Sequence, residues 1–458
     1  MAIAVTNPAT GETIREFVEH DSAEVEARVA KTQAAYEALK ETTYAQRAQW
    51  MKASADILEA EVDELAKMIT IEMGKPISQS VGEVLKCAKN MRFYADNAEQ
   101  FLADEPLEDP SVVGASQAYL HYQPLGVVLA VMPWNYPLWQ VIRFAAPALM
   151  AGNTGLLKHA SNVPESAMYL DSLFTRGGFP DGSFTTILTG AGPVAGLIDD
   201  RRIKAVTLTG SEPAGRAVAG RAGSNIKKAV MELGGSDAFI VMPSADIEQA
   251  STVAVTARVN NNGQSCIAGK RFIVHADVYD EFVEKFSQKM GALVVGDPLE
   301  EATQIGPLAT EKGRQEIAEL VDDAVAKGAR VLTGGKAPER DGWFYEPTVL
   351  DGLDESMRLV MEEAFGPVAS VYKVSSREEA AQIANQTTFG LSSALWTTDS
   401  SDEEFFIKNI EAGAVFLNGM TISYPELPFG GVKDSGFGRE LGAPGIREFC
   451  NFKTIWKS

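Results

Sequence analysis

The stretch LGVVLAVMPW, residues 125–134, decides the fold class of this chain. It is a continuous apolar run, which is typical of a strand buried on both faces of a parallel sheet. The segments that follow alternate between helical and strand patterns: a helix over 139–150, a strand over 154–158, a helix over 165–176 and a strand over 184–188. This alternation predicts an α/β protein with a doubly wound parallel sheet.

The flanking sequence extends this pattern in both directions. Before it, amphipathic helical patterns cover residues 22–39, 45–73 and 81–102, which predicts a helical layer packed on the sheet. After Glu232 the alternation resumes with a strand near 238–242, and it continues to about residue 417, so we expect a second α/β domain.

Length and charge restrict the classes of function. The chain has 458 residues, enough for two or three domains, and a formal net charge of −21. This charge repels polyanions, so nucleic acid and anionic membranes are not expected partners. The three cysteines and four histidines form no metal-binding pattern, and a cytoplasmic location is expected because no leader-like or membrane-spanning run is present.

One cysteine stands out from the other two. Cys266 lies in the polar, glycine-containing segment NNNGQSCIAGK, residues 260–270, between a helical pattern and a strand pattern. We expect an exposed, flexible loop there, which is where a nucleophile would be placed. The alternative is a small buried cysteine with a packing role.

Two glycine-containing turns are candidate nucleotide sites. GAGPVA, residues 190–195, matches a dinucleotide fingerprint, but about 20 residues later Gly210 stands where that fingerprint needs an acid, so a tight turn is the preferred interpretation. TLTGSEPAG, residues 207–215, is the better candidate. There Gly210 and Ser211 begin a helix whose free N–H groups could face a phosphate, although Ser211 could also be a simple N-cap.

Two further residues follow predicted strands. Glu232, in MELGG, comes at the carboxyl end of a strand, where a carboxylate can serve as a general base. Asn135, in PWNYP, lies between two prolines, and a fixed amide can stabilise an oxyanion. An ion pair for Glu232 and a turn role for Asn135 are the alternatives.

The motifs PWNYP, GNTGLLKHAS, TGSEPAG, MELGG, NNNGQSC and EEAFGPV occur in this order. Together they resemble the aldehyde dehydrogenase superfamily over about residues 5–458. The resemblance implies a Rossmann-like cofactor domain (1–108 and 125–234), an α/β catalytic domain (235–434) and a small β oligomerisation arm (109–124 and 446–458). It also implies a homodimer or a homotetramer.

The resemblance assigns the chemistry to particular residues. Cys266 would attack the aldehyde carbon, and the Asn135 amide and the Cys266 backbone N–H would hold the oxyanion. Hydride would then pass to a nicotinamide, and Glu232 would activate water to hydrolyse the thioester to a carboxylate.

The resemblance also implies the cofactor contacts. Glu363 and Phe365 match the residues beside the nicotinamide ribose and ring, and Lys158 matches the lysine at the adenosine ribose. Trp134, Gly210, Ser211 and Leu233 occupy further contact positions. Ser161 stands where NAD-preferring members tend to have Glu, so NADP is expected, NAD could be accepted, and His159 is a possible helper.

The substrate is predicted from two further positions. Arg143 and Ser423 match residues that face the substrate carboxylate in succinate-semialdehyde dehydrogenases, although Asn260 replaces a second arginine found in many of them. A broad-specificity enzyme for other small aldehydes is the alternative. Glu232 argues against an enzyme that transfers the acyl group to coenzyme A, and the complete set of motifs argues against an inactive scaffold.

Overall fold

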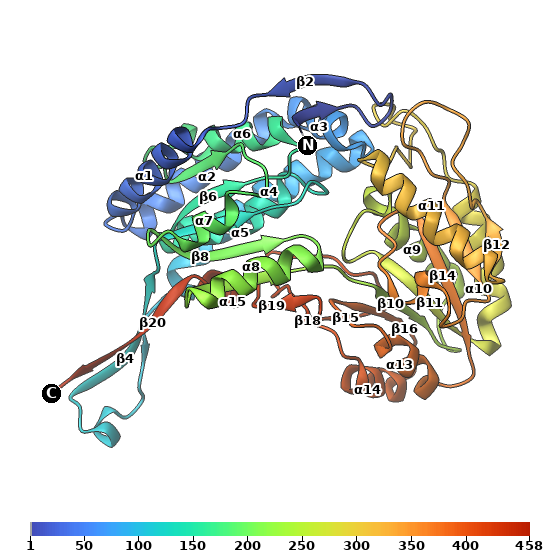
Figure 1. Cartoon of the computed structure of the whole chain (residues 1–458). Coiled ribbons are helices and arrows are strands. Elements are labelled where there is room, and N and C mark those ends of the chain that lie inside the picture. Colours follow the sequence, from blue (N-terminus) through green and yellow to red (C-terminus); the bar gives the residue numbers. More distant parts are fainter. Residues whose placement is uncertain (1) are drawn as a thin grey trace.

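The computed structural model describes residues 2–458 and divides them into two α/β bodies and a projecting arm (Figure 1). The first body is built on a six-stranded sheet with the order β19-β9-β8-β5-β6-β7. Its strands are β5 (Val127–Val131), β6 (Thr154–Lys158), β7 (Phe184–Ile187), β8 (Ile203–Thr209), β9 (Lys228–Glu232) and the antiparallel β19 (Gly436–Phe437).

The order of the parallel strands reverses between β5 and β8. From β5 the chain moves outward through β6 and β7, and it then returns to add β8 and β9 on the other side. Ligands of such sheets bind at the carboxyl ends of the strands beside this reversal. Residues just after β5 and β8, and at the ends of β6 and β9, therefore share one edge of the sheet.

Helices cover this sheet, as the sequence pattern predicted. They are α1 (Ser22–Leu39), α2 (Tyr44–Ala60), α3 (Val62–Met73), α4 (Ile77–Phe101), α5 (Trp139–Ala151), α6 (Pro164–Arg176), α7 (Val194–Asp199), α8 (Glu212–Ser224) and α15 (Gly442–Arg447). The expected start of α1 is correct, because Asp21 accepts a bond from the Glu24 N–H at 2.8 Å. The single pattern expected over 45–73 is two helices, which meet at Glu61.

The second body contains a seven-stranded sheet with the order β12-β13-β14-β11-β10-β16-β17. Its strands are β10 (Asp237–Val241), β11 (Gly269–His275), β12 (Arg330–Thr333), β13 (Thr348–Asp351), β14 (Val368–Val374), β16 (Ser393–Trp396) and β17 (Val415–Leu417). Its helices are α9 (Ile247–Val259), η2 (Asn260–Gly263), α10 (Ala276–Gly291), α11 (Glu311–Ala326), α12 (Arg358–Met361), α13 (Arg377–Asn385) and α14 (Ser400–Asn409). Only β12 runs antiparallel to its neighbour, so both bodies confirm the predicted α/β class.

Two small antiparallel strand pairs lie outside the main sheets. One is β1 (Ile3–Thr6) with β2 (Thr13–Phe17), and the other is β15 (Phe389–Gly390) with β18 (Val432–Lys433). After β18 the chain returns to the first body, where β19 pairs with β9 and the Leu233 N–H donates to the Ser435 carbonyl at 2.9 Å. This return crosses the chain beside Glu232 and fixes its backbone.

The arm extends away from both bodies and ends at the C-terminus (Figure 1). Strands β4 (Gln117–Pro124) and β20 (Cys450–Lys457) pair antiparallel along their whole length, and η1 (Pro110–Val113) precedes β4. A third strand, β3 (Glu105–Pro106), also pairs with β4. The arm therefore includes residues that the sequence analysis assigned to the cofactor domain.

Across residues 2–458, every helix is too short or too polar to cross a lipid bilayer.

Candidate active site

Three neighbouring pockets form the candidate site, and two of them are lined by Cys266. The Arg143 pocket, of about 250 Å³, is lined by Arg143, Ser423 and Cys266 among others. The Trp134 pocket, of about 320 Å³, is also lined by Cys266. The Lys158 pocket, of about 700 Å³, shares Trp134 with it. Cys266 therefore lies at the junction of the first two pockets.

The loop that carries Cys266 is buried, so the prediction of an exposed, flexible loop is wrong. Asn261 and Asn262 adopt left-handed backbone conformations, with φ of 58° and 56°, and both side chains are fully enclosed. Asn261 Nδ2 donates to the carbonyls of Asn135 and Gln264 at 2.8 and 2.9 Å. Asn262 Nδ2 donates to the carbonyls of Gly74 and Pro307, both at 2.9 Å. These amides hold an irregular backbone that no sheet or helix supports.

Two buried cations complete the support of this loop. Arg258 donates to the carbonyls of Gly263 and Gly269 and lines none of the three pockets. Lys270 donates to the carbonyls of Ser265 and Cys266, both at 2.8 Å, and it forms an ion pair with Glu363 at 3.0 Å. Sequence reasoning missed Lys270, although a lysine four residues after a candidate nucleophile was visible.

Burial controls the reactivity of Cys266. It raises the pKa of the thiol to about 12, while the positive charges of Arg143 and Lys270 act to lower it. The resting side chain is therefore a neutral thiol at pH 7, and it must lose its proton before it can act as a nucleophile. Its backbone N–H has no acceptor among residues 2–458, so it is free to bind a ligand oxygen.

Asn135 lies beside the cysteine in the Trp134 pocket. Its side chain is buried, and Nδ2 donates one hydrogen bond to the Gln264 carbonyl at 3.1 Å. An amide nitrogen carries two hydrogens, so a second donor remains. This placement agrees with the oxyanion role inferred from the sequence.

Glu232, at the end of β9, is only 2% exposed and lines none of the three pockets. Its carboxylate points toward Gly430, where an added Cβ would lie 2.8 Å from Oε1. Neither oxygen has a hydrogen-bond partner among residues 2–458. Burial, reinforced by the nearby Glu440 carboxylate, holds the pKa of Glu232 well above its ordinary value.

Arg143 lines its pocket from α5, but its charge is already neutralised. It forms a close, fully buried ion pair with Glu440, and its guanidinium lies 4.6 Å from the ring centre of Phe429. The sequence analysis expected Arg143 to face a ligand carboxylate and did not identify Glu440. A buried arginine needs such a partner, but a linear sequence does not show which acid supplies it.

Ser423 is buried and accepts a hydrogen bond from Lys86 Nζ at 2.7 Å. Lys86 comes from α4, more than 300 residues earlier, and it lines the same pocket as Cys266. Asn260, at the position of the missing second arginine, also lines this pocket. The sequence did not single out Lys86, because its position in a helical pattern is the same as that of the other charged residues on the helices that cover the sheet.

The Lys158 pocket contains polar groups without protein partners. Lys158 and Ser161 both line it, and Lys158 forms no salt bridge within residues 2–458. Burial lowers the pKa of Lys158, which Glu19 partly opposes. Asn162 Nδ2, a buried donor with no partner in the same region, also belongs to a residue of this pocket. An uncompensated cation with free donors fits an anionic ligand.

His159 does not assist Lys158. Its ring is buried and Nε2 lies 2.9 Å from the Pro137 carbonyl, outside the residues that line the pocket. Burial lowers its pKa to about 4, so the ring is neutral and contributes no positive charge. The expectation of a helping histidine is therefore wrong.

The remaining predicted contacts surround the Trp134 pocket. Its lining residues include Trp134, Gly210, Ser211, Leu233, Glu363 and Phe365. Trp134 and Phe365 meet edge to face, with ring centres 5.7 Å apart. Ser211 is the N-cap of α8, but its hydroxyl makes no cap hydrogen bond and remains available. GAGPVA lines none of the three pockets, and the Gly190 N–H donates to Glu19 Oε1 at 2.8 Å, as in a structural turn.

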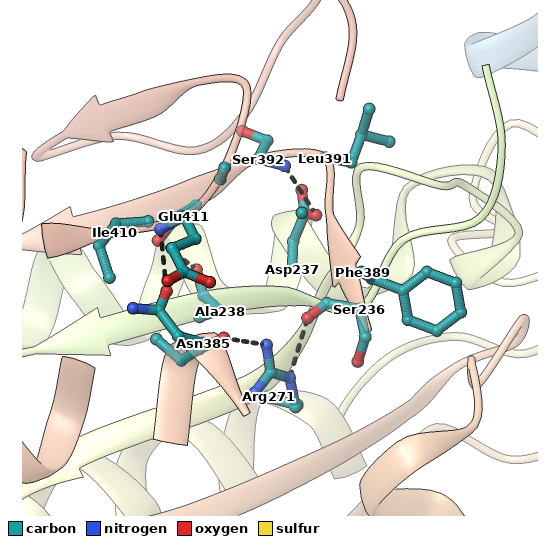
Figure 2. Close-up of a pocket in the computed structure, with 14 residues that line it drawn as sticks. Ser236, Asp237, Ala238, Arg271, Asn385, Phe389, Leu391, Ser392, Ile410 and Glu411 are labelled. Atoms are coloured by element: carbon teal, nitrogen blue, oxygen red, sulfur yellow. Dashed lines mark hydrogen bonds between the residues drawn. The ribbon is translucent and has the colours of Figure 1, made fainter. Parts of the chain in front are cut away.

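A fourth hollow lies outside this site. Figure 2 shows Asp237, Ser392 and Arg271 around it, and none of its lining residues belongs to the three pockets. Asp237 Oδ1 accepts from the Ser392 N–H at 3.1 Å, and Arg271 Nε donates to the Ser236 carbonyl at 2.9 Å. Burial raises the pKa of Asp237 to about 7. These internal bonds give the hollow a structural role.

Comparison with known proteins identifies relatives over the full length. Residues 1–455 match the profile of the aldehyde dehydrogenase family. A Mycobacterium avium protein named succinate-semialdehyde dehydrogenase [NADP(+)] is 61% identical, covering 100% of this chain and 97% of that protein. A Mycobacterium tuberculosis protein named succinate-semialdehyde dehydrogenase [NADP(+)] 1 is 60% identical, with 100% of both chains covered.

Solved structures agree with this match. The crystal structure of succinic semialdehyde dehydrogenase from Streptococcus pyogenes, in complex with NADP+, superposes with a TM-score of 0.96. The two sequences are 36% identical, and the match covers 99% of each chain.

The buried thiol predicts slow, strongly pH-dependent alkylation. With a pKa near 12, the thiolate fraction of Cys266 rises about tenfold for each pH unit between 7 and 9. Iodoacetamide labelling of the cysteine peptide, followed by mass spectrometry, should rise by the same factor without a plateau. The Cys266→Ser variant controls for labelling of Cys87 and Cys450. A plateau near pH 8 would contradict the assigned environment.

Proposed function

Because the chain belongs to the aldehyde dehydrogenase family, we propose that it oxidises succinate semialdehyde to succinate with NADP as the hydride acceptor. The names of the 60–61% identical relatives support this substrate and cofactor. The observation that carries the proposal is the position of Cys266, which lines both the Arg143 pocket and the Trp134 pocket. One sulfur atom can therefore meet an aldehyde from one side and a redox cofactor from the other.

The first step forms a bond between Cys266 Sγ and the aldehyde carbon. The thiol passes its proton to solvent water, the C=O π bond breaks as the S–C bond forms, and the carbonyl oxygen becomes an oxyanion. The Cys266 N–H and the second hydrogen of Asn135 Nδ2 are assigned to bind this oxygen, and both lack a protein acceptor among residues 2–458. Lys270 stabilises the geometry, because it holds the Ser265 and Cys266 carbonyls on the opposite side of the loop.

NADP would occupy the Lys158 and Trp134 pockets and supply the hydride acceptor. Lys158 and Ser161 are assigned to the adenosine end with its 2′-phosphate. Gly210 and Ser211, at the start of α8, are assigned to the diphosphate. Trp134, Leu233, Glu363 and Phe365 are assigned to the nicotinamide end. The free donors of the Lys158 pocket support this fit.

Glu232 is assigned to hydrolysis of the thioester left on Cys266. A water molecule adds to the thioester carbon, Glu232 accepts its proton, and the C–S bond breaks to release succinate and the thiol. Glu232 is buried away from the pockets, so its side chain must rotate toward them and lose its proton before this step. Arg143 and Ser423 are assigned to the carboxylate end of the substrate, in the pocket that they line.

We assign the arm to assembly of a homodimer or homotetramer. Phe452 and Trp456 are each 52% exposed on β20, which has a free edge. Such exposed aromatic residues are typical of a subunit interface. We also propose a cytoplasmic location, because all three cysteines are free thiols. We keep the predicted division at residues 125, 234 and 434 as our proposal for the domains, and we begin the arm at β3 instead of after residue 108.

Steady-state kinetics with succinate semialdehyde test the substrate and the cofactor together. We expect a higher kcat/KM with NADP than with NAD, because Ser161 leaves room for the 2′-phosphate beside Lys158. The Ser161→Glu variant should lose at least about tenfold with NADP and retain NAD activity, since a carboxylate repels the phosphate. A wild-type enzyme that oxidises butanal as efficiently would favour the broad-specificity alternative.

The Glu232→Gln variant should form the thioester and hydrolyse it slowly. We expect a burst of about one NADPH for each subunit, followed by turnover about 10²–10⁴-fold below wild type. In the wild type the hydrolysis rate should rise with pH, because the pKa of Glu232 is raised above its ordinary value and only the deprotonated carboxylate can accept the proton of water. The variant should lack this rise. Quenched-flow kinetics measure both the burst and the hydrolysis. The Cys266→Ser variant should show no burst. Turnover at the wild-type rate in the Glu232→Gln variant would contradict the role of Glu232 in hydrolysis.

The double variant Phe452→Glu/Trp456→Glu should form smaller assemblies than the wild type. Charged side chains at these positions would be buried without partners if the arm lies in a subunit interface. Light scattering after size exclusion measures the mass. The matched control is Val18→Glu/Ile226→Glu, which changes two exposed apolar residues outside the arm. An unchanged mass of the arm variant would refute this assignment.

A further inference from the structure

The Arg143 pocket contains one charge that the protein does not balance. Its charged lining residues are Glu83, Lys86 and Arg143. Glu83 forms a buried ion pair with Lys75 and accepts the Leu138 and Trp139 N–H groups, both at 2.9 Å. Arg143 is paired with Glu440. Lys86 forms no salt bridge within residues 2–458, so a positive charge remains for a ligand.

The position of Lys86 suits recognition of an anion. Its ammonium lies between two walls of the pocket, 2.7 Å from Ser423 Oγ and 4.2 Å from the ring centre of Trp139. Ser423 accepts one hydrogen bond from Lys86, which leaves the other ammonium hydrogens free and allows the serine hydroxyl to donate. Both groups could therefore donate to the same ligand oxygen.

Lys86 carries its charge at neutral pH. Burial lowers its pKa to about 8, and the nearby Arg143 charge acts in the same direction. The ammonium is therefore mostly protonated at pH 7, but it is destabilised by the absence of a counter-ion. A carboxylate in the pocket would provide that counter-ion.

We propose that Lys86, together with Ser423, binds the distal carboxylate of the substrate while Cys266 binds its aldehyde. This inference rests on the proposed function and names the residue that selects for a semialdehyde acid. Lys86 and Cys266 line the same pocket, so a short chain with an aldehyde at one end and a carboxylate at the other can reach both.

Arg143, which the proposed function also assigns to this carboxylate, then acts mainly through its positive charge. Its guanidinium is 2% exposed, is neutralised by Glu440 and covers the Phe429 ring. A ligand carboxylate that displaced Glu440 would leave that acid buried and unpaired, which is costly. Arg143 adds positive potential to the pocket, and Lys86 makes the direct contact.

The test compares two aldehydes in two lysine variants. Succinate semialdehyde carries the distal carboxylate, and butanal has the same carbon chain without it. We expect Lys86→Met to lower kcat/KM for succinate semialdehyde about 10- to 100-fold, mainly through KM, because a charge-assisted hydrogen bond is lost. Its kcat/KM for butanal should stay within about twofold of wild type, and Lys86→Arg should recover most of the loss.

Lys89→Met is the matched control, since Lys89 lies one turn further along α4 and pairs with Glu426 on the surface. It should leave both substrates unchanged. A wild type that shows no preference for succinate semialdehyde over butanal would refute the proposed function itself. A wild type with that preference, retained in a Lys86→Met variant that melts at the same temperature, would overturn only the role of Lys86. An equal loss for both substrates would also overturn it, because it would indicate a structural role.

Discussion

The architecture of this site depends on one constraint, the need to satisfy the buried backbone of the cysteine loop. Residues 260–268 are neither helical for long nor part of a sheet, yet most of them are enclosed. Unpaired backbone groups in such a place are costly, so side chains must replace the missing ladder. Asn261, Asn262, Arg258 and Lys270 do this by donating to backbone carbonyls, several of them within the loop itself. The polar side chains of this loop are therefore explained by the need to pair its buried backbone groups.

The two sheets place the remaining groups around this loop. In the first sheet the strand order reverses between β5 and β8, so Asn135, Lys158, Gly210 and Glu232 are brought to one edge. In the second sheet it reverses between β10 and β16, and the cysteine loop leads into β11 beside that reversal. Ligand-binding side chains collect at the edge of a sheet where the strand order reverses. Because the two sheets present such edges toward each other, both bodies contribute walls to the site.

Much of this could be predicted from the sequence, and the failures have physical causes. The strand at 127–131, the helix at 139–151 and the capped helix at 22–39 follow from local periodicity, which depends only on neighbouring residues. The arm could be predicted only from the family resemblance, because an isolated pair of strands has no distinctive sequence period. The partners Arg143–Glu440 and Lys86–Ser423 could not be predicted, since each joins residues about 300 positions apart. The cysteine loop was wrongly predicted to be exposed, because Asn, Gly and Ser are also the residues that are common in exposed turns.

The buried and half-buried cations discussed above fall into two groups, and the distinction separates support from recognition. Arg258 donates only to carbonyls, while Lys270 and Arg143 pair with acids of the same chain. Lys86 and Lys158 lack an acidic partner within residues 2–458, and each lines a pocket. In a chain with a net charge of −21, acids are abundant, and an enclosed cation without an acidic partner carries a desolvation cost that an anionic ligand would offset. Under the proposed function, the two lysines mark the two ends at which an anionic substrate and an anionic cofactor would bind, and the paired cations fix the geometry between them.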